Sequence, residues 1–524
     1  MEPARELGKG MFASSAIWLD FPDLEEVEQY KIDRYYPAYD FVLLEESLRE
    51  RIKQVPPHAK AKTYTYWSYT DGVWAEELLR ENKQAEEAAV LAEGICAMAK
   101  LAGSEVNRKD AIKSIWHDIL KYQHHDVHWI EVTDLRRRAV NYLKEGMIRS
   151  REIMSEAAKQ LIKEDANYIA VFNGLARKRR CLVEADGDAV PAGRFQKLGD
   201  RSFGFVDVPA GGFASFKVST AEASEKKPLP EKIETKNYAV EFSDDGLMKQ
   251  ITIGKKNLLK TGKFLGGEIK ALINNEWVDN RSANCKFYSG DVAYIVERTA
   301  SLGRIPVREK YLFFKKEPFI KAEIEFDFNG DEVGVFWLDD TKIDVYYPTV
   351  GTAVFNDIPF GYVQAKENRP LFPTNWLYCG GLVYVNRGTN KHWVSDGVIA
   401  NVVAWGGNRF SNRIHLNWSN KTQYDLRLYG KQRIEYFLMP IGEFDGNRIV
   451  REVEAMTAPV FVTKGKGEKS FYDSADKNLT VTSVHEKDGE VWMRGYKLPS
   501  TDKSRYRNWE IFDGPAGSLK KKRH

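Results

Sequence analysis

The chain has 524 residues, and its 78 lysine and arginine residues nearly balance 75 acidic ones, which leaves a formal net charge of +3. A chain this close to neutrality lacks the strongly basic surface typical of a dedicated nucleic-acid-binding protein. Its hydrophobic fraction of 43% supplies enough apolar side chains for packed cores and excludes a largely disordered chain. No apolar run approaches the ~18 residues that a membrane-spanning helix needs.

The start of the chain and its cysteines bear on the cellular compartment. The sequence begins without the cationic stretch and apolar segment of a secretory signal. The four cysteines are far apart and form no Cys-x-x-Cys pair; they are Cys96, Cys181, Cys285 and Cys379. Unpaired thiols suit a reducing environment. We therefore expect a cytoplasmic protein that binds neither nucleic acid nor membrane, and the sequence leaves a homo-oligomer open.

Residues 1–65 form an irregular, aromatic-rich lead-in with one predicted helix, Leu43–Gln54. Pro56 and Pro57 then end that helix, because proline has no amide hydrogen and restricts the residue before it. The segment is too short and too broken to predict an independent domain.

Residues 66–165 have the helical period. Apolar residues recur there at three- and four-residue spacing, which predicts amphipathic helices. The predicted helices are Glu76–Leu101, a second one that starts at Asn107 or Asp110 and ends near Gln123, and Thr133–Ile162. Three amphipathic helices with short links predict a three-helix bundle.

Beyond this bundle the period changes to two, with turn residues between short apolar runs, which predicts β-strands. Residues 166–221 are predicted to form a small β domain. Residues 222–232 are polar and contain prolines, so they are the predicted linker. Residues 233–524 predict a large antiparallel β-sandwich without helical breaks, ending in a basic tail. The predicted fold class is multidomain α+β: a three-helix bundle, a small β domain and a large sandwich.

Three of the nine histidines fall within five residues at the predicted end of the second helix. They are His124, His125 and His128, and Asp126 lies between them. Imidazole and carboxylate groups together suit zinc. The competing interpretation is a polar helix end at which one histidine bonds to a backbone carbonyl. The residue pattern alone leaves both interpretations open.

Several motifs follow one another in an order that carries more information than any one of them. They are Tyr66–Thr70, Arg80–Glu86, Leu91–Glu93, Ile115–Asp126, Val171–Gly174, Val208–Phe213, Asn237–Leu247 and Ile358–Gly361. In this order they resemble the central helical domain and the β-rich region of glycoside hydrolase family 38, the α-mannosidases. The resemblance covers most of residues 66–500.

The resemblance implies roles for the histidine cluster. In this family the second histidine of the motif binds zinc and the following aspartate contacts the sugar, which assigns those roles to His125 and Asp126; His124 is the second choice as a zinc ligand. The zinc ion binds adjacent hydroxyl groups of the terminal mannose. The implied reaction is a retaining hydrolysis with two carboxylates, a nucleophile and an acid/base, about 5 Å apart.

Two features depart from the family. After Asp126 the family usually has a small turn, whereas this chain continues with Val127–Ile130. The family also has a catalytic domain before the bundle, with a His-x-Asp zinc pair, whereas the first histidine here is His58 and no His-x-Asp precedes the bundle. Residues 1–65 then resemble at most the end of that domain, and the nucleophile and acid/base stay unassigned.

The sequence therefore predicts the C-terminal portion of a zinc-dependent α-mannosidase, acting on mannose-containing oligosaccharides and inactive without its catalytic domain. That domain could arrive as a separate chain. The rival hypothesis is a non-catalytic carbohydrate-binding or scaffolding protein, for which the many aromatic residues could stack on sugars. A third hypothesis is an enzyme that acts alone with Asp71, Asp118 or Asp126 as its carboxylates.

Overall fold

The computed structural model describes most of the chain after residue 74. The described residues are 75–104, 107–123, 133–334, 343–365, 372–389, 391–404, 406, 427–474, 476, 479–487, 489–498 and 511–515. All of them belong to one compact unit, Thr70–His524, and the other unit, Met1–Tyr69, lies outside them. The predicted helix Leu43–Gln54 and the prediction for residues 1–65 also lie outside the described residues.

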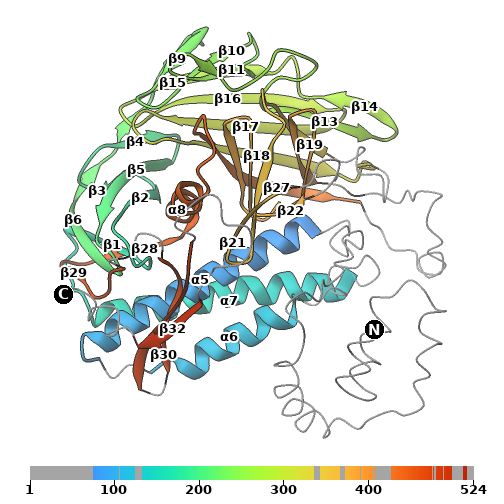
Figure 1. Cartoon of the computed structure of the whole chain (residues 1–524). Coiled ribbons are helices and arrows are strands. Elements are labelled where there is room, and N and C mark those ends of the chain that lie inside the picture. The colour runs from blue at the N-terminus through green and yellow to red at the C-terminus, as the bar shows by residue number, and fades with distance from the viewer. Residues whose placement is uncertain are drawn as a thin grey trace, which may run out of the picture. The chain divides into compact units, whose positions relative to one another are not determined.

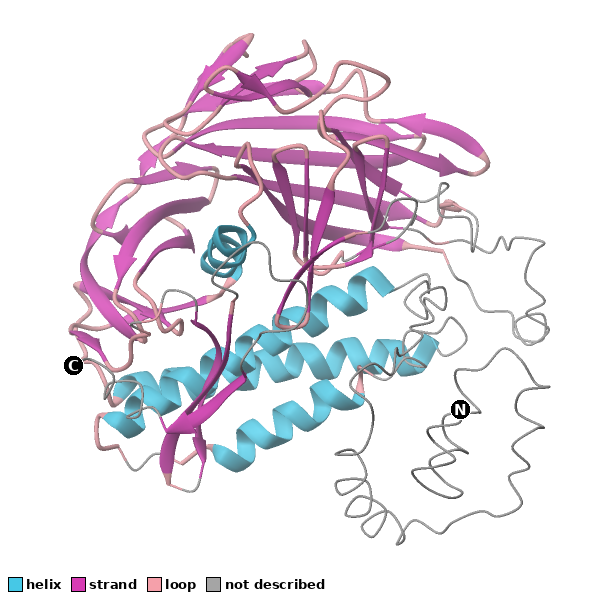
Figure 2. Ribbon diagram, in the orientation of Figure 1, coloured by secondary structure: helices cyan, strands magenta, loops and turns pink. Residues whose placement is uncertain are grey.

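Three helices form the predicted bundle and lie side by side (Figure 2). They are α5 (Ala75–Leu101), α6 (Lys109–Lys121) and α7 (Thr133–Lys159). Strong helix formers make up most of α5. Ala85, Ala92 and Ala99 are buried at seven-residue intervals, so small side chains recur along the buried face of α5. The backbone leaves the helix at Gly103, whose φ of +90° favours glycine.

Two smaller sheets follow the bundle. Among the described strands, the first sheet has the order β28-β1-β6-β29, and β3 also pairs with β6. Its strands are β1 (Tyr168–Asn173), β3 (Ala189–Pro191), β6 (Gly212–Thr220), β28 (Val460–Lys464) and β29 (Glu468–Ser470). The second has the order β2-β5-β4-β7. Its strands are β2 (Arg179–Asp186), β4 (Phe195–Leu198), β5 (Arg201–Val208) and β7 (Glu222–Ala223).

The large sandwich is built on a sheet of ten described strands, which we call the ten-stranded sheet (Figure 1). Its order is β21-β20-β23-β24-β27-β18-β17-β16-β15-β8. Its strands are β8 (Glu225–Lys227), β15 (Asn284–Ser289), β16 (Ala293–Leu302), β17 (Ile305–Phe314), β18 (Ile320–Asn329), β20 (Val354–Ile358), β21 (Gly361–Gln364), β23 (Trp376–Cys379), β24 (Leu382–Asn386) and β27 (Tyr429–Pro440).

Two further sheets complete the sandwich in the described part of the chain. One has the order β14-β13-β19-β26-β25-β22 and the other β12-β11-β10-β9. Their strands are β9 (Lys232–Glu234), β10 (Ala239–Phe242), β11 (Met248–Ile253), β12 (Lys256–Asn257), β13 (Glu268–Ile273), β14 (Glu276–Asp279), β19 (Ile343–Pro348), β22 (Phe372–Pro373), β25 (Lys391–Ser395) and β26 (Val398–Ala404). One continuous apolar core joins these sheets to the ten-stranded sheet.

Side chains alternate between the two faces of the ten-stranded sheet. On β18, Ile320, Ala322 and Ile324 enter the sandwich core. Lys321 and Glu323 therefore lie on the opposite face, which we call the outer face. At one end, apolar residues of this outer face share a second core with residues of β2, β5 and α8 (Gly446–Thr457).

Helix α8 corrects one expectation, because the sandwich was predicted to have no helical break. Asp445 caps the helix by accepting a hydrogen bond from the Arg448 amide at 2.9 Å. Ile449, Val450 and Val453 are buried at helical spacing. The prediction was wrong because this short amphipathic stretch lies among strand patterns of similar composition.

The end of the chain returns to the beginning of the described part. β28 pairs with β1, so that Phe461 lies opposite Phe172. A further sheet, β30-β31-β32 among the described strands, includes two strands that pack on α5. Its strands are β30 (Leu479–Lys487), β31 (Glu490–Lys497) and β32 (Ile511–Pro515). The sequence did not predict this return.

The α+β fold class is confirmed: three packed helices are followed by several antiparallel sheets, one of them large. The exact domain boundaries stay predictions. Within the predicted linker 222–232, the short strands β7 and β8 pair with β4 and β15. None of the described helices is long and apolar enough to cross a membrane.

Candidate functional site

The predicted zinc and sugar ligands follow directly after the described end of α6. His124, His125 and Asp126 lie outside the described residues, as do His128 and Asp71. The described residues nearest to this segment in the chain are those at the end of α6.

The end of α6 is fixed by two contacts. Tyr122 is buried, and its ring stacks on that of Tyr142 from α7 with the ring centroids 5.5 Å apart. The side-chain amide of Gln123, the last residue before the histidines, donates a hydrogen bond to Glu86 of α5. Gln123, the last described residue before the histidine cluster, is therefore fixed beside α5.

Burial raises the pKa of three carboxylates on α5: Glu81, Glu86 and Glu93. Burial raises the pKa of Glu86, and the hydrogen bond from Gln123 opposes that rise. Burial raises the pKa of Glu93 to about 7, although the indole of Trp116 donates to this carboxylate at 2.8 Å. Burial likewise raises the pKa of Glu81, and Lys144 lies 3.6 Å away. Each of these contacts joins α5 to a neighbouring helix.

A second polar contact joins α5 to the ten-stranded sheet. Arg387, just after β24, donates two hydrogen bonds to the carboxylate of Glu87, at 2.8 and 2.6 Å. It also donates to the carbonyl oxygen of Thr457 at the end of α8, at 2.8 Å. One guanidinium thus joins α5, the sheet and α8.

The backbones also come close at this contact. Gly388 has φ +115°, and a Cβ atom there would lie 2.5 Å from the Cα of Arg80. Only glycine allows the two segments to approach this closely.

A loop of the sandwich extends this contact. Lys83 donates to the side-chain oxygen of Asn375 at 2.9 Å. The amide group of Asn375 in turn donates to Asp357 at 2.8 Å. Asp357 also accepts the backbone amides of Asn375 and Trp376, at 2.8 and 3.0 Å. Glu87 and Asp357 therefore act as structural acceptors in this region.

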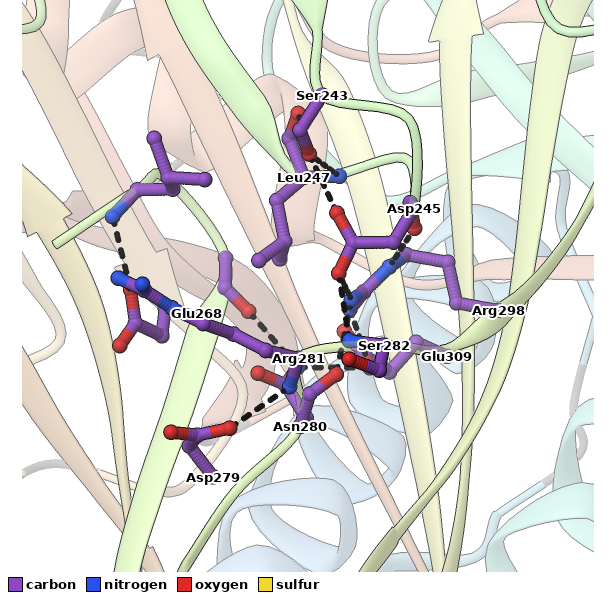
Figure 3. Close-up of polar contacts among 12 residues, drawn as sticks. Ser243, Asp245, Leu247, Glu268, Asp279, Asn280, Arg281, Ser282, Arg298 and Glu309 are labelled. Atoms are coloured by element: carbon purple, nitrogen blue, oxygen red, sulfur yellow. Dashed lines mark hydrogen bonds and ion pairs between the residues drawn. The ribbon is translucent and has the colours of Figure 1, made fainter.

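Other carboxylates considered from the sequence also have structural partners. Asp118 accepts a hydrogen bond from Arg149 at 2.6 Å, which joins α6 to α7. The turn Asp244–Gly246 connects two paired strands, β10 and β11. Asp245 there accepts from the Ser282 amide and from Arg298, at 3.1 and 3.2 Å (Figure 3).

A zinc site cannot be assembled from the described residues alone. In that part of the chain, no three or more histidine, cysteine, aspartate or glutamate side chains lie together as metal ligands. The donor chemistry of His125 suits zinc, and its placement stays a prediction.

The sequence reasoning missed the contact between α5 and the sheet. Glu87 and Arg387 are 300 positions apart, and neither carries a local motif. The approach of Arg80 to Gly388 likewise depends on tertiary packing.

A comparison with protein-family models found no match, and neither did a comparison with curated protein sequences. Similar solved structures include two from Enterococcus faecalis. An α-mannosidase from Enterococcus faecalis V583 matches 87% of this chain with 12% sequence identity and a TM-score of 0.62. A protein in glycosyl hydrolase family 38 from Enterococcus faecalis matches 90% with 13% identity and the same TM-score. The chain spans 66% and 69% of their respective lengths. The described bundle and sheets thus share the fold of part of these proteins.

Proposed function

We propose that this chain is the C-terminal portion of a zinc-dependent, retaining α-mannosidase that hydrolyses terminal α-mannosides of oligosaccharides. The observation that carries this proposal is the structural match over 87–90% of the chain to two proteins described as an α-mannosidase and a glycosyl hydrolase family 38 protein. The order of the sequence motifs supports it independently.

In this proposal the chain supplies two groups to the site. The imidazole of His125 is a zinc ligand and the carboxylate of Asp126 accepts hydrogen bonds from mannose hydroxyl groups. A bound zinc ion would supply a positive charge that holds adjacent hydroxyl groups of the terminal sugar. The other zinc ligands, the nucleophile and the acid/base come from a catalytic domain outside these 524 residues.

The described contacts give this portion a positioning role. The Gln123–Glu86 hydrogen bond fixes the end of α6 against α5. Arg387 and Lys83 then tie α5 to the sandwich. A ligand segment that follows a fixed helix end needs less ordering when substrate binds, which favours catalysis.

We expect the chain alone to leave a chromogenic α-mannoside uncleaved, with or without zinc. Addition of a catalytic domain that carries a His-x-Asp pair should give zinc-dependent hydrolysis. The variant His125→Ala should then lower kcat/KM by more than roughly 100-fold, because loss of a metal ligand exceeds the effect of losing its outer-shell support.

His117→Ala is the matched control. His117 is exposed on α6, so its substitution should leave turnover unchanged. Zinc-dependent turnover by the chain alone would contradict the incomplete site. Unchanged activity of His125→Ala would contradict the assigned ligand. Mannoside binding without zinc dependence, and without turnover in the combined sample, would instead support a carbohydrate-binding protein.

A further inference from the structure

A charged groove lies on the outer face of the ten-stranded sheet. Its volume is about 490 Å³, within the range of small-molecule sites. Its lining includes Arg201 from β5 together with Lys286, Glu297, Arg308, Glu323 and Glu325 from β15 to β18. We call this cavity the charged groove. None of its lining residues comes from α5, α6 or α7.

Strand register builds the floor of the groove. Residues directly opposite each other on neighbouring strands have side chains on the same face. One row across the sheet is Lys286, Glu297, Lys310 and Glu323. The next row is Asn284, Thr299, Arg308, Glu325 and Arg433. Polar and charged side chains therefore replace the apolar residues that cover the other end of this face.

The negative charge of the central carboxylate of the groove is balanced by cations of the protein itself. Glu323 lies 2.7 Å from Lys310, 3.2 Å from Lys321 and 2.6 Å from Arg433. Despite burial, these cations lower the pKa of Glu323 to about 2. Its negative charge is thus balanced within the protein.

Three other cations line the groove and are not held at hydrogen-bond distance by a described carboxylate: Arg201, Arg308 and Lys286. The nearest carboxylate oxygens to the Arg201 guanidinium are 3.7 and 3.8 Å away, on Glu184 and Glu323. Arg308 lies 3.9 Å from Glu325, and its side chain is 71% exposed. These separations exceed hydrogen-bond length. Lys286 is exposed and lies opposite Glu297 in the strand register, and among the described residues its ammonium group makes no ion pair or side-chain hydrogen bond.

The groove therefore presents more hydrogen-bond donors than its own carboxylates use. Each guanidinium has five N–H donors and no acceptor, and an ammonium has three donors. Carboxylate and phosphate groups match guanidinium geometry and form strong charge-assisted hydrogen bonds. Asn284, Thr299 and Glu325 line the same space and can exchange hydrogen bonds with hydroxyl groups.

We propose that the charged groove binds a small anionic sugar, with Arg201, Arg308 and Lys286 contacting its phosphate or carboxylate group and the neighbouring polar residues contacting its hydroxyl groups. This site is separate from the helix end at which the mannoside site is proposed. It does not depend on the proposed function.

Calorimetric titration of the whole chain tests this site with four matched probes: glucose 6-phosphate, glucuronate, inorganic phosphate and glucose. None of these probes is a mannoside, so their binding does not report on the proposed mannoside site. Both anionic sugars should bind, each more tightly than inorganic phosphate, and glucose should not bind measurably. The double variant Arg201→Gln/Arg308→Gln should weaken both anionic sugars by roughly tenfold or more, because charge-assisted hydrogen bonds are lost.

Lys286→Gln, at an exposed position, should weaken binding in the same direction and provides a second variant if the double variant fails to fold. Arg151→Gln, at an exposed position on α7, is the matched control and should bind as the unmodified chain does. The proposal is overturned if no anionic sugar binds, if glucose binds equally well, or if the groove variants bind unchanged. Inorganic phosphate binding as tightly as glucose 6-phosphate would overturn the sugar part of the proposal. Equal weakening by Arg151→Gln would overturn the assignment to this groove.

Discussion

At the scale of single residues, the sandwich core contains an ion pair that is fully removed from solvent. Arg298 and Glu309 lie on neighbouring strands, with a side-chain nitrogen and oxygen 2.6 Å apart (Figure 3). Burial raises the pKa of Glu309, and donors from Arg298, Asn280 and Tyr311 oppose that rise. Arg298 also donates to the backbone oxygen of Asp245 at 2.6 Å. The pair therefore fixes the β10–β11 turn against two strands of the large sheet.

We expect Glu309→Ala to lower the free energy of unfolding by about 3 kcal/mol, because it leaves the buried Arg298 without its carboxylate. Chemical denaturation measures the change. Glu325→Ala is the control, since its contact with Arg308 is long and exposed and should contribute less than about 1 kcal/mol. Equal losses of unfolding free energy in the two variants would show that the buried pair stabilises the fold no more than the exposed pair does.

At the scale of elements, α5 is the common scaffold of the described site. Its Glu86 contacts the end of α6, its Glu87 contacts Arg387 near the sheet, and its Glu93 contacts Trp116 inside the bundle. Glu86 and Glu93 lie on the side of α5 that faces α6, seven positions apart, and Glu87 contacts the sheet. A buried acid in such a position makes the packing of the bundle sensitive to pH.

Glu93 allows this sensitivity to be tested. Its ordinary pKa is 4.5, and burial raises the value in the folded chain to about 7. Between these values the folded state binds a proton that the unfolded state has released. The free energy of unfolding should therefore fall as pH rises from about 4.5 to about 7. The stability that the bound proton contributes at lower pH should be lost above the folded pKa.

Denaturation at a series of pH values should show a flatter profile for Glu93→Gln than for the unmodified chain. Glu152→Gln, at an exposed position on α7, should leave the profile unchanged. A Glu93→Gln profile as steep as that of the unmodified chain would contradict the assigned proton.

At the scale of the whole described unit, the chain closes on itself. Segments after residue 459 pair with β1 and β6 and pack on α5. Tyr472 is buried, donates to the carbonyl oxygen of Gly174 at 3.0 Å and lies against Gly211, where a Cβ atom would come within 2.1 Å of its ring. This residue joins the C-terminal segment to the first sheet and to the bundle core.

Tyr472→Ala should therefore lower the free energy of unfolding by about 3–5 kcal/mol through the cavity that it leaves. Helix and strand signals should shift together, because one core spans the bundle and the returning strands. Circular dichroism and tyrosine and tryptophan fluorescence measure the two signals.

Leu120→Ala is the control for this change, because Leu120 is 61% exposed on α6 and should cost little. Separate transitions for the helix and strand signals in Tyr472→Ala would argue against a single cooperative unit.

The sequence alone determined the features that depend on local periodicity. The three helices and the change to strands after the bundle follow from hydrophobic spacing and turn residues, because each pattern lies within one segment. The motif order also indicated an α-mannosidase-like fold, which the structural matches support. The assignments of His125 and Asp126 stay predictions.

Tertiary structure decided what depends on distant residues. The Arg387–Glu87 contact, the return of the C-terminal strands and the charged groove join segments separated by tens to hundreds of positions. Only strand register placed Lys310 beside Glu323. Periodicity specifies which face a side chain occupies within its own element. Packing between elements specifies what that face meets.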